Sequence, residues 1–287
     1  MNQGKIDLHI HTTISDGTDA PAALLARMRE AGFVAFSVTD HDAVAGCLEI
    51  ESALVEGDPT FINGVEFSCE DEMGKYHVLG YGYDPRAAAV VSLVEQGHAY
   101  RMGKVKQRLD FLAETYGFTF SEEERASLYA LSNPGKPHIA NLMIKHGYAS
   151  SIGEAIKNYL NKFKGKEKRI RPEDAVRAIE AAGGIPVIAH PAFGSGDERI
   201  FGEALEERMR HLTEIGIRGA EVYYSGFSSE IRDSLLALAE RYDLYVTAGS
   251  DYHGINKTVP LGETGLDPSA PMPDRLVRFL ADVRKTR

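Results

Sequence analysis

The chain has few cysteines, no long apolar run and a shortage of basic charge. Cys47 and Cys69 are its only cysteines and form no CxxC pair, so neither a disulfide framework nor a thiolate zinc site is expected. No apolar run approaches the roughly 18 residues that span a bilayer, and residues 1–5 are not followed by an apolar signal segment. We therefore expect a cytoplasmic protein with no membrane partner.

The charge balance argues against a further class of function. The 287 residues contain 32 Lys and Arg against 42 Asp and Glu, which gives a formal net charge of −10. An extended nucleic-acid surface needs a basic footprint, so none is expected. A small anionic substrate stays compatible with the charge, because a bound cation can reverse the local field. The sequence leaves the oligomeric state unknown.

Two regions of alternating strands and helices are separated by a helical stretch. Residues 6–83 and 172–285 alternate short apolar runs with amphipathic segments, which is typical of a parallel α/β architecture. From about residue 87 to residue 160 we predict only helices. A helical block inside an alternating chain indicates an inserted subdomain. We therefore predict an α/β domain of residues 1–90 and 170–287 and a helical insert of residues 91–169, which we expect to cap the substrate.

The predicted elements set up specific expectations for the structure. Strands are predicted at residues 6–10, 34–38, 61–68, 76–83, 186–189, 219–223 and 244–248. Helices outside the insert are predicted at residues 20–31, 44–54, 175–182, 201–215, 229–241 and 273–285. Thr18 and Asp19 are expected to cap the first helix. The strand that carries His77 follows a tight polar turn and is expected to run antiparallel.

Two histidines one residue apart follow the first apolar run. Side chains alternate faces in a strand, so His9 and His11 are expected to point the same way. At a strand's carboxyl end they can bind one metal ion, and Asp16 in a turn-prone Ser-Asp-Gly can reach the same point. The alternative interpretation is a solvated strand with two incidental histidines.

Further ligand-type side chains stand at or near predicted strand ends. With the three residues above they make nine candidates: His9, His11, Asp16, His41, Glu66, His77, His190, Asp251 and His253. The carboxyl ends of parallel barrel strands meet at one face, so we expect one site. Imidazole and carboxylate without thiolate suit zinc, manganese or iron. Nine candidates exceed the about four to six ligands of one ion, which predicts two or three divalent ions bridged by Glu66 or Asp251.

The motifs together resemble the PHP (polymerase and histidinol phosphatase) family. They are Asp7-Leu8-His9-Ile10-His11 with Ser15-Asp16-Gly17, Thr39-Asp40-His41-Asp42, Gly64-Val65-Glu66, His77-Val78-Leu79-Gly80, Ala189-His190-Pro191 and Gly249-Ser250-Asp251-Tyr252-His253-Gly254. The resemblance extends from residue 6 to about residue 262. It implies a distorted (β/α)7 TIM-like barrel and metal ligands at all nine candidates. Asp16 stands where many trinuclear members have histidine.

A segment of the insert resembles a phosphate-binding feature of small bacterial PHP phosphoesterases. Lys136-Pro137-His138 stands where those members have Arg-x-His, so a point charge replaces a bidentate fork. The preceding Asn-Pro-Gly places Lys136 and His138 at a helix start, where backbone N–H groups favour an anion. Lys257 is a third candidate for contact with a substrate phosphate. For both lysines the alternative is an incidental, solvated side chain.

These patterns lead to one functional hypothesis and several rivals. We expect hydrolysis of a phosphate ester of a small nucleotide or sugar phosphate by a metal-bridging hydroxide, with Asp251, His41 and His253 in catalysis. The rivals among hydrolases are a cyclic phosphodiesterase that cleaves both ester bonds in sequence, 5′-3′ trimming of short RNA, and an amidohydrolase. The rival from another class is a degenerate metal-binding regulatory module, which the full set of ligand-type residues disfavours.

Overall fold

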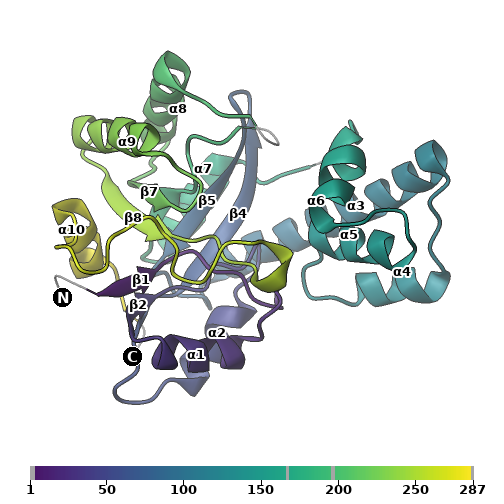
Figure 1. Ribbon diagram of the computed structural model, residues 1–287. Helices are drawn as coiled ribbons and strands as arrows, with labels where there is room; N and C mark the ends of the chain where they lie inside the picture. The colour runs from purple at the N-terminus through teal and green to yellow at the C-terminus, as the bar shows by residue number, and fades with distance from the viewer. Residues whose placement is uncertain (1–3, 166–167, 195–197, 286–287) are drawn as a thin grey trace.

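The structure, a computed structural model, describes residues 4–165, 168–194 and 198–285. It has a mixed α/β fold in which helices flank the strands and a group of helices lies to one side (Figure 1). Among the described residues, the first sheet has the order β1 (Lys5–Asp7), β2 (Phe33–Phe36), β3 (Thr60–Phe61). All its pairings are parallel, as the strand–helix alternation predicts.

The second sheet carries a long hairpin at one edge. Its order is β4 (Gly64–Asp71), β5 (Gly74–Tyr81), β6 (Ile185–Ile188), β7 (Gly219–Tyr224), β8 (Tyr245–Gly249). β5 runs antiparallel to both neighbours, which confirms the expected direction of the strand with His77, and β6, β7 and β8 are parallel. The ends of β6, β7 and β8 therefore lie on one side.

Isolated backbone pairings join the two sheets at both seams. At the first seam, Leu8 N–H donates to Ala248 O at 2.9 Å and Ile10 pairs with Tyr252. At the second, His41 pairs with Glu66 as an isolated bridge. The described strands thus form two sheets, because the chain continues past β1 and β2 in irregular segments that pair with the second sheet at isolated positions.

Helices outside the insert cover the sheets with their apolar faces. They are α1 (Pro21–Glu30), α2 (Ala45–Ala53), α7 (Pro172–Ala181), α8 (Gly202–Glu214), α9 (Ser229–Arg241) and α10 (Asp274–Asp282). α1 buries Leu24, Leu25 and Met28 in a cluster with Phe36 of β2, and α10 buries Phe279 in the larger core of the second sheet. None of the described helices is both long and apolar enough to cross a lipid bilayer.

Three local predictions were wrong in detail. The expected strand 61–68 is split into β3 and β4 around Ile62 and Asn63. β1 ends at Asp7, so His9 and His11 lie just beyond the strand and not within it. α1 starts after Ala20 with Pro21 in its first turn and has no side-chain cap. Ala20, and not Thr18 or Asp19, occupies the N-cap position, and Pro21 fits the first turn because its missing N–H needs no partner there.

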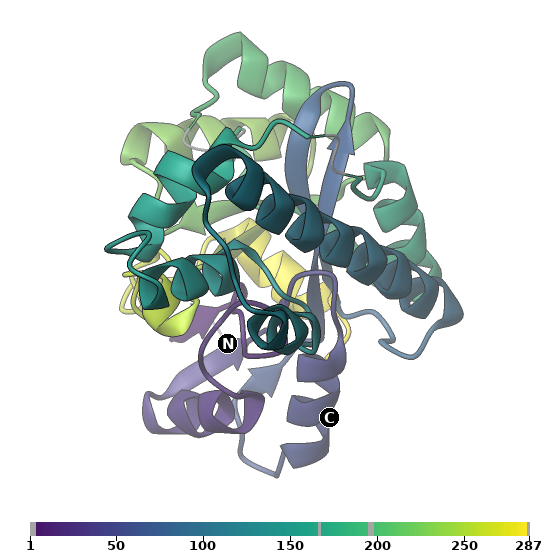
Figure 2. The same cartoon turned by 90° about the vertical axis from the view of Figure 1, so that its right-hand side faces the viewer.

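The helical group to one side has a hydrophobic core of its own. It contains α3 (Ala88–Tyr116), α4 (Glu122–Tyr129), α5 (Lys136–Lys145) and α6 (Ile152–Glu154), then a π turn and a 3₁₀ turn that end at Lys162. Figure 2, viewed from their side, shows these helices in front of the sheets. α3 joins both cores: Val90 and Leu93 pack with the sheets, whereas Leu109 and Leu112 pack within the group. Residues 166–167 of the predicted insert lie outside the described residues.

Candidate metal centre

Glu66 of β4 lies at the centre of the predicted site. Its Oε2 is 3.0 Å from His41 Nδ1, 3.2 Å from His11 Nε2 and 3.4 Å from His9 Nε2. The Glu66 side chain is only 1% exposed. Three imidazoles from two different loops therefore surround one carboxylate oxygen.

The second oxygen of Glu66 faces a different pair of histidines. Oε1 lies 2.8 Å from Nδ1 of His77 on β5 and 3.2 Å from Nε2 of His190, which follows β6. The antiparallel direction of β5 explains why His77 reaches the site from an early position on its strand. Glu66 thus stands between two groups of imidazoles, as a bridging carboxylate must.

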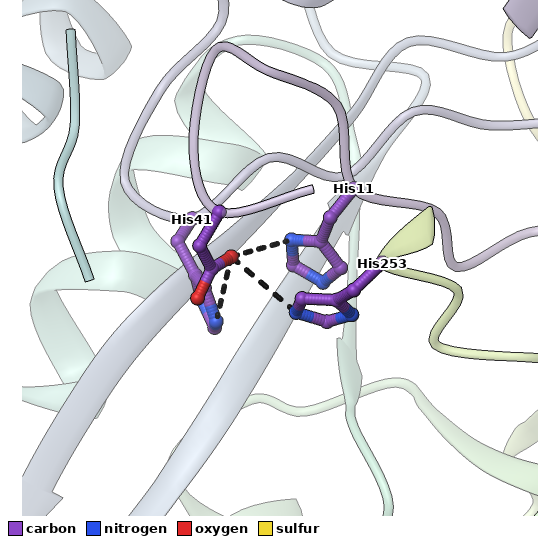
Figure 3. Close-up of side chains that lie close together, drawn as sticks. His11, His41 and His253 are labelled. Atoms are coloured by element: carbon purple, nitrogen blue, oxygen red, sulfur yellow. Dashed lines mark ion pairs between the residues drawn. The ribbon is translucent and has the colours of Figure 1, made fainter. Parts of the chain in front are cut away.

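Asp16 gathers three histidines on the other side of the site. Its Oδ1 lies 3.3 Å from His253 Nε2, 3.7 Å from His11 Nδ1 and 4.0 Å from His41 Nε2. In Figure 3 the three labelled histidines surround one carboxylate oxygen, which is this Oδ1. The turn after the first strand therefore returns the Asp16 carboxylate to the site, as the Ser-Asp-Gly motif predicts.

Asp251 divides its two oxygens between histidines and a lysine. Oδ1 lies 3.3 Å from His11 Nε2 and 3.6 Å from His9 Nε2. Oδ2 accepts hydrogen bonds from Tyr224 OH at 2.9 Å and from Lys257 Nζ at 2.5 Å. The backbone of Asp251 is left-handed, with φ of 57°, a conformation that aspartate tolerates better than most residues with a side chain.

The residues present fit a cluster of divalent cations. Within the described chain, three groups around the site have ligand atoms within 4.8 Å of one another: His11, Asp16, His41, His253; His9, His11, Asp251; and His41, Glu66, His77. Several of their buried donor atoms have no hydrogen-bond partner: His9 Nε2, His11 Nε2, Asp16 Oδ1, His41 Nδ1, Glu66 Oε2 and His77 Nδ1. Buried polar atoms are almost always paired, so a cluster of unpaired nitrogen and oxygen donors is the pattern of a metal site.

The charge states of the site also suit a cation. Burial lowers the pKa of His253 to about 4, and the positive charge of Lys257 acts in the same direction, so this imidazole is neutral at pH 7 and its nitrogen lone pair is free to bind. Burial alone would raise the pKa of Glu66, but His77 and His41 outweigh it and hold that pKa well below its usual value. The site therefore offers a neutral imidazole at His253 beside an ionised carboxylate at Glu66.

Glu221 of β7 contacts two residues of the site and was not among the residues predicted from the sequence. Its Oε1 lies 2.9 Å from His9 Nδ1, and its Oε2 accepts the backbone N–H of His190 at 2.8 Å. The side chain is fully buried. The available signal was a single charged residue inside an otherwise apolar strand, since a buried carboxylate needs nearby partners.

Asp40 supports the loop that carries His11. It accepts hydrogen bonds from Thr12 N–H at 2.8 Å, Thr12 Oγ1 at 2.7 Å and Ser15 Oγ at 2.6 Å. Ser15 Oγ in turn lies 3.3 Å from His11 Nδ1. A short chain of hydrogen bonds thus orients the His11 ring from the neighbouring loop.

Two residues of the helical group hold the loop of His41. Arg101 of α3 bonds Asp42 Oδ2 through Nη2 at 2.7 Å and Ser68 Oγ through Nη2 at 3.0 Å. Asn133, which precedes α5, donates through its side-chain amide to the carbonyl oxygen of His41. No local sequence pattern predicts these contacts, because the partners are far apart along the chain.

The predicted phosphate-binding segment begins beside the site. A Cβ atom on Gly135 would lie 2.8 Å from Asp16 Oδ2, so the start of α5 packs closely against this carboxylate. His138 Nδ1 accepts the Gly135 N–H at 3.0 Å. Lys136 Nζ donates to Asn161 Oδ1 at 2.6 Å, a contact within the helical group. The structure therefore brings His138 near the nine residues. The Lys136 side chain, in contrast, contacts Asn161 within the helical group.

Three relatives of known activity match most of the chain. A 5′-3′ exoribonuclease of Haemophilus influenzae is 30% identical over 254 residues, covering 87% of this chain and 90% of that protein. A 3′,5′-nucleoside bisphosphate phosphatase of Chromobacterium violaceum is 29% identical over 255 residues, covering 86% and 87%. A phosphoribosyl 1,2-cyclic phosphate 1,2-diphosphodiesterase of Eggerthella lenta is 30% identical over 261 residues, covering 88% and 96%.

Solved structures share the fold over nearly the whole chain. A Bifidobacterium adolescentis protein described as a metal-dependent phosphoesterase has a TM-score of 0.83 at 28% identity, with 96% of each chain covered. A Chromobacterium violaceum amidohydrolase with bound sulfate has a TM-score of 0.80 at 25% identity, covering 99% of this chain and 98% of that one. The PHP domain model matches residues 7–170, more than half of the chain. With its nine histidines and carboxylates gathered at one site, this protein belongs to the PHP domain family of metal-dependent phosphoesterases.

Proposed function

We propose that this protein hydrolyses a phosphate ester of a small nucleotide or sugar phosphate at the nine-residue site. The main support for the proposal is the position of Glu66 between two groups of imidazoles. Asp251 Oδ1 adds a second carboxylate oxygen, 3.3 Å from His11 Nε2, the nitrogen that also faces Glu66 Oε2. We further infer that the two bridged sheets form the distorted barrel that the sequence resemblance implies, since both seams carry backbone pairings.

The nine residues would hold two or three divalent ions, with Mn²⁺, Fe²⁺ and Zn²⁺ as the candidates. Glu66 and Asp251 are the natural bridges, because each faces several histidines through its oxygens. Divalent ions bound here would supply an activated water and neutralise the charge of a phosphate. Binding of a third ion would depend on Asp16, whose Oδ1 lies close to both His253 and His11.

The remaining residues of the site act on the substrate. Burial lowers the pKa of Lys257, but Asp251 outweighs it and raises the pKa, so Lys257 stays protonated and can orient a phosphate. His138 and the backbone N–H groups at the start of α5 offer further donors beside Asp16. Positioning by these groups, together with charge neutralisation, is the main source of catalysis in phosphoryl transfer.

The helical group would limit the size of the substrate. Gly135 packs against Asp16, and Asn141 of α5 contacts Asn256 beyond His253 at 3.4 Å. These contacts would close one side of the site, which favours a terminal phosphate over an internal linkage of a long chain. These contacts therefore favour a small phosphomonoester as the substrate. The cyclic phosphodiester and the 5′ end of short RNA remain the alternatives, because the three relatives act on all these substrate types at nearly equal identity.

A direct comparison of substrates tests the proposal. Protein loaded with Mn²⁺, Fe²⁺ or Zn²⁺ is incubated with a nucleoside 3′,5′-bisphosphate, a cyclic phosphoribose ester and a short 5′-phosphorylated RNA, and phosphorus NMR follows the products. We expect release of inorganic phosphate from the bisphosphate at the highest rate, and loss of most of that activity in Asp251→Asn. Faster opening of the cyclic ester, or stepwise nucleotide release from RNA, would replace our substrate assignment. No hydrolysis of any ester would favour the regulatory module.

A further inference from the structure

We propose that Glu221 is a positioning residue that sets two metal-binding histidines at once, His9 and His190. The inference rests on the proposed function, in which both histidines are metal ligands. Glu221 lies in the middle of β7 and is completely buried. Its two carboxylate oxygens have separate partners in two different loops, one following β1 and one following β6.

The contact with His9 fixes which ring nitrogen carries the proton. An ionised carboxylate only accepts hydrogen bonds, so at 2.9 Å from Glu221 Oε1 the His9 Nδ1 must be the protonated nitrogen. In the neutral ring, the form that binds a metal, His9 Nε2 is then the bare nitrogen. It points to Glu66 Oε2 at 3.4 Å and Asp251 Oδ1 at 3.6 Å, the position in which a cation would be bound. Glu221 therefore selects the tautomer that can bind a metal.

The contact with His190 acts through the backbone. His190 has φ of 29°, a left-handed conformation that costs energy in a residue with a side chain. Glu221 Oε2 accepts its backbone N–H at 2.8 Å and holds this turn in place. This backbone conformation directs His190 Nε2 to within 3.2 Å of Glu66 Oε1. One carboxylate thus orients ligands on both sides of Glu66.

The neighbouring strand leaves room for this carboxylate only because it has a glycine there. A Cβ atom on Gly249 of β8 would lie 2.4 Å from Glu221 Oε1 and 2.2 Å from His9 Cβ. Both distances are far below a normal contact, so no side chain fits at this position without displacing Glu221 or His9. The Glu221–His9 contact therefore depends on glycine at position 249 of the neighbouring strand.

Glutamine tests the role because it keeps the shape but offers a single acceptor oxygen. In Glu221→Gln, either His9 Nδ1 or the His190 N–H must face an amide NH₂ group. We expect zinc affinity, measured by competition with a chromophoric chelator, to fall by about 10- to 100-fold, the usual effect of losing such a partner. Glu51→Gln, the same change in a residue paired with Arg86 away from the site, should bind zinc like the wild type.

A second readout keeps the test independent of activity and of folding of the variant. In zinc-loaded wild type labelled with ¹⁵N-histidine, long-range ¹H–¹⁵N spectra should show the His9 proton on Nδ1, with His9 assigned from the spectrum of His9→Gln. A proton on Nε2, or equal zinc affinity in folded Glu221→Gln and wild type, would overturn the role of Glu221. If the wild type itself binds no metal, the proposed metal centre fails instead.

Discussion

Arg101 of α3 bonds Asp42 Oδ2 through both Nη2, at 2.7 Å, and Nε, at 3.2 Å. Asp42 directly follows His41, so this pair ties the helical group to a loop of the metal centre. Burial raises the pKa of Asp42, but Arg101 and Lys104 outweigh it and lower the pKa to about 2. Asp42 is therefore a buried charge that needs its cationic partner.

Removal of that partner should destabilise the protein strongly. We expect Arg101→Met to lower the free energy of unfolding by about 3–5 kcal/mol, because it leaves a buried carboxylate uncompensated. Urea unfolding followed by circular dichroism measures the change. As the control, Arg210→Met breaks the exposed pair of Arg210 and Glu214 and should cost at most about 1 kcal/mol. Equal stability of the two variants would show that the Arg101 contact does not anchor the subdomain.

Asp251 should be essential for activity but not for folding. Asparagine keeps the shape and the bond from Tyr224, but it removes the charge that faces His9 and His11. Loss of a bridging ligand is expected to cost several kcal/mol of transition-state stabilisation, so kcat/KM should fall at least about 100-fold. Asp233→Asn on the surface of α9 is the control. Wild-type turnover by metal-loaded Asp251→Asn would count decisively against the assignment.

His138 should act mainly in substrate capture. Its ring lies at the start of α5, beside Gly135 and Asp16, and it contacts none of the predicted bridging carboxylates in the described structure. We expect His138→Ala to raise KM by about 10-fold, equivalent to about 1.4 kcal/mol of lost binding, with kcat nearly unchanged. His146→Ala, at the other end of α5 and paired with Glu124, is the matched control. Unchanged kinetics in His138→Ala would end its proposed role.

Divalent ions should stabilise the folded protein. The buried unpaired donors around Glu66 are satisfied only when cations are bound, so metal binding favours the native state. At a free Mn²⁺ or Zn²⁺ concentration 100 times Kd the gain is about 2.7 kcal/mol, which should raise Tm by several degrees in a thermal scan. The double variant His11→Gln/Asp251→Asn is expected to lose most of that shift. A chelator-treated wild type whose Tm does not respond to metal would contradict the fit of the site.

The proximity of the proposed ligand residues was predictable because they follow strand ends in local motifs. His9, His11 and Asp251 stand directly after short apolar runs, and the convergence of parallel strand ends then predicts that they meet. These side chains lie together although β1 ends at Asp7, because the loop that follows continues to pair with the chain after β8. Local pattern and topology together were sufficient for these residues.

The supporting contacts depended on packing that no local pattern shows. The lone charge of Glu221 in an apolar strand indicates a buried carboxylate but not its partners, which depend on the packing of β7, a strand buried on both faces. Arg101 and Asp42 are 59 residues apart in the sequence, and they meet only because α3 packs against the sheets. The division at Asn63 also escaped prediction, since an apolar run of that length reads as one strand.

Crystallography with anomalous scattering, on protein purified without chelators, tests the central claim most directly. We predict two or three divalent ions per chain, each within about 2.0–2.3 Å of its nitrogen and oxygen ligands, with Glu66 or Asp251 shared between neighbouring ions. A full-occupancy structure with no ion among these nine residues, or with ions bound only at Asp71, Glu72 and His211 near the β4–β5 turn, would contradict the account.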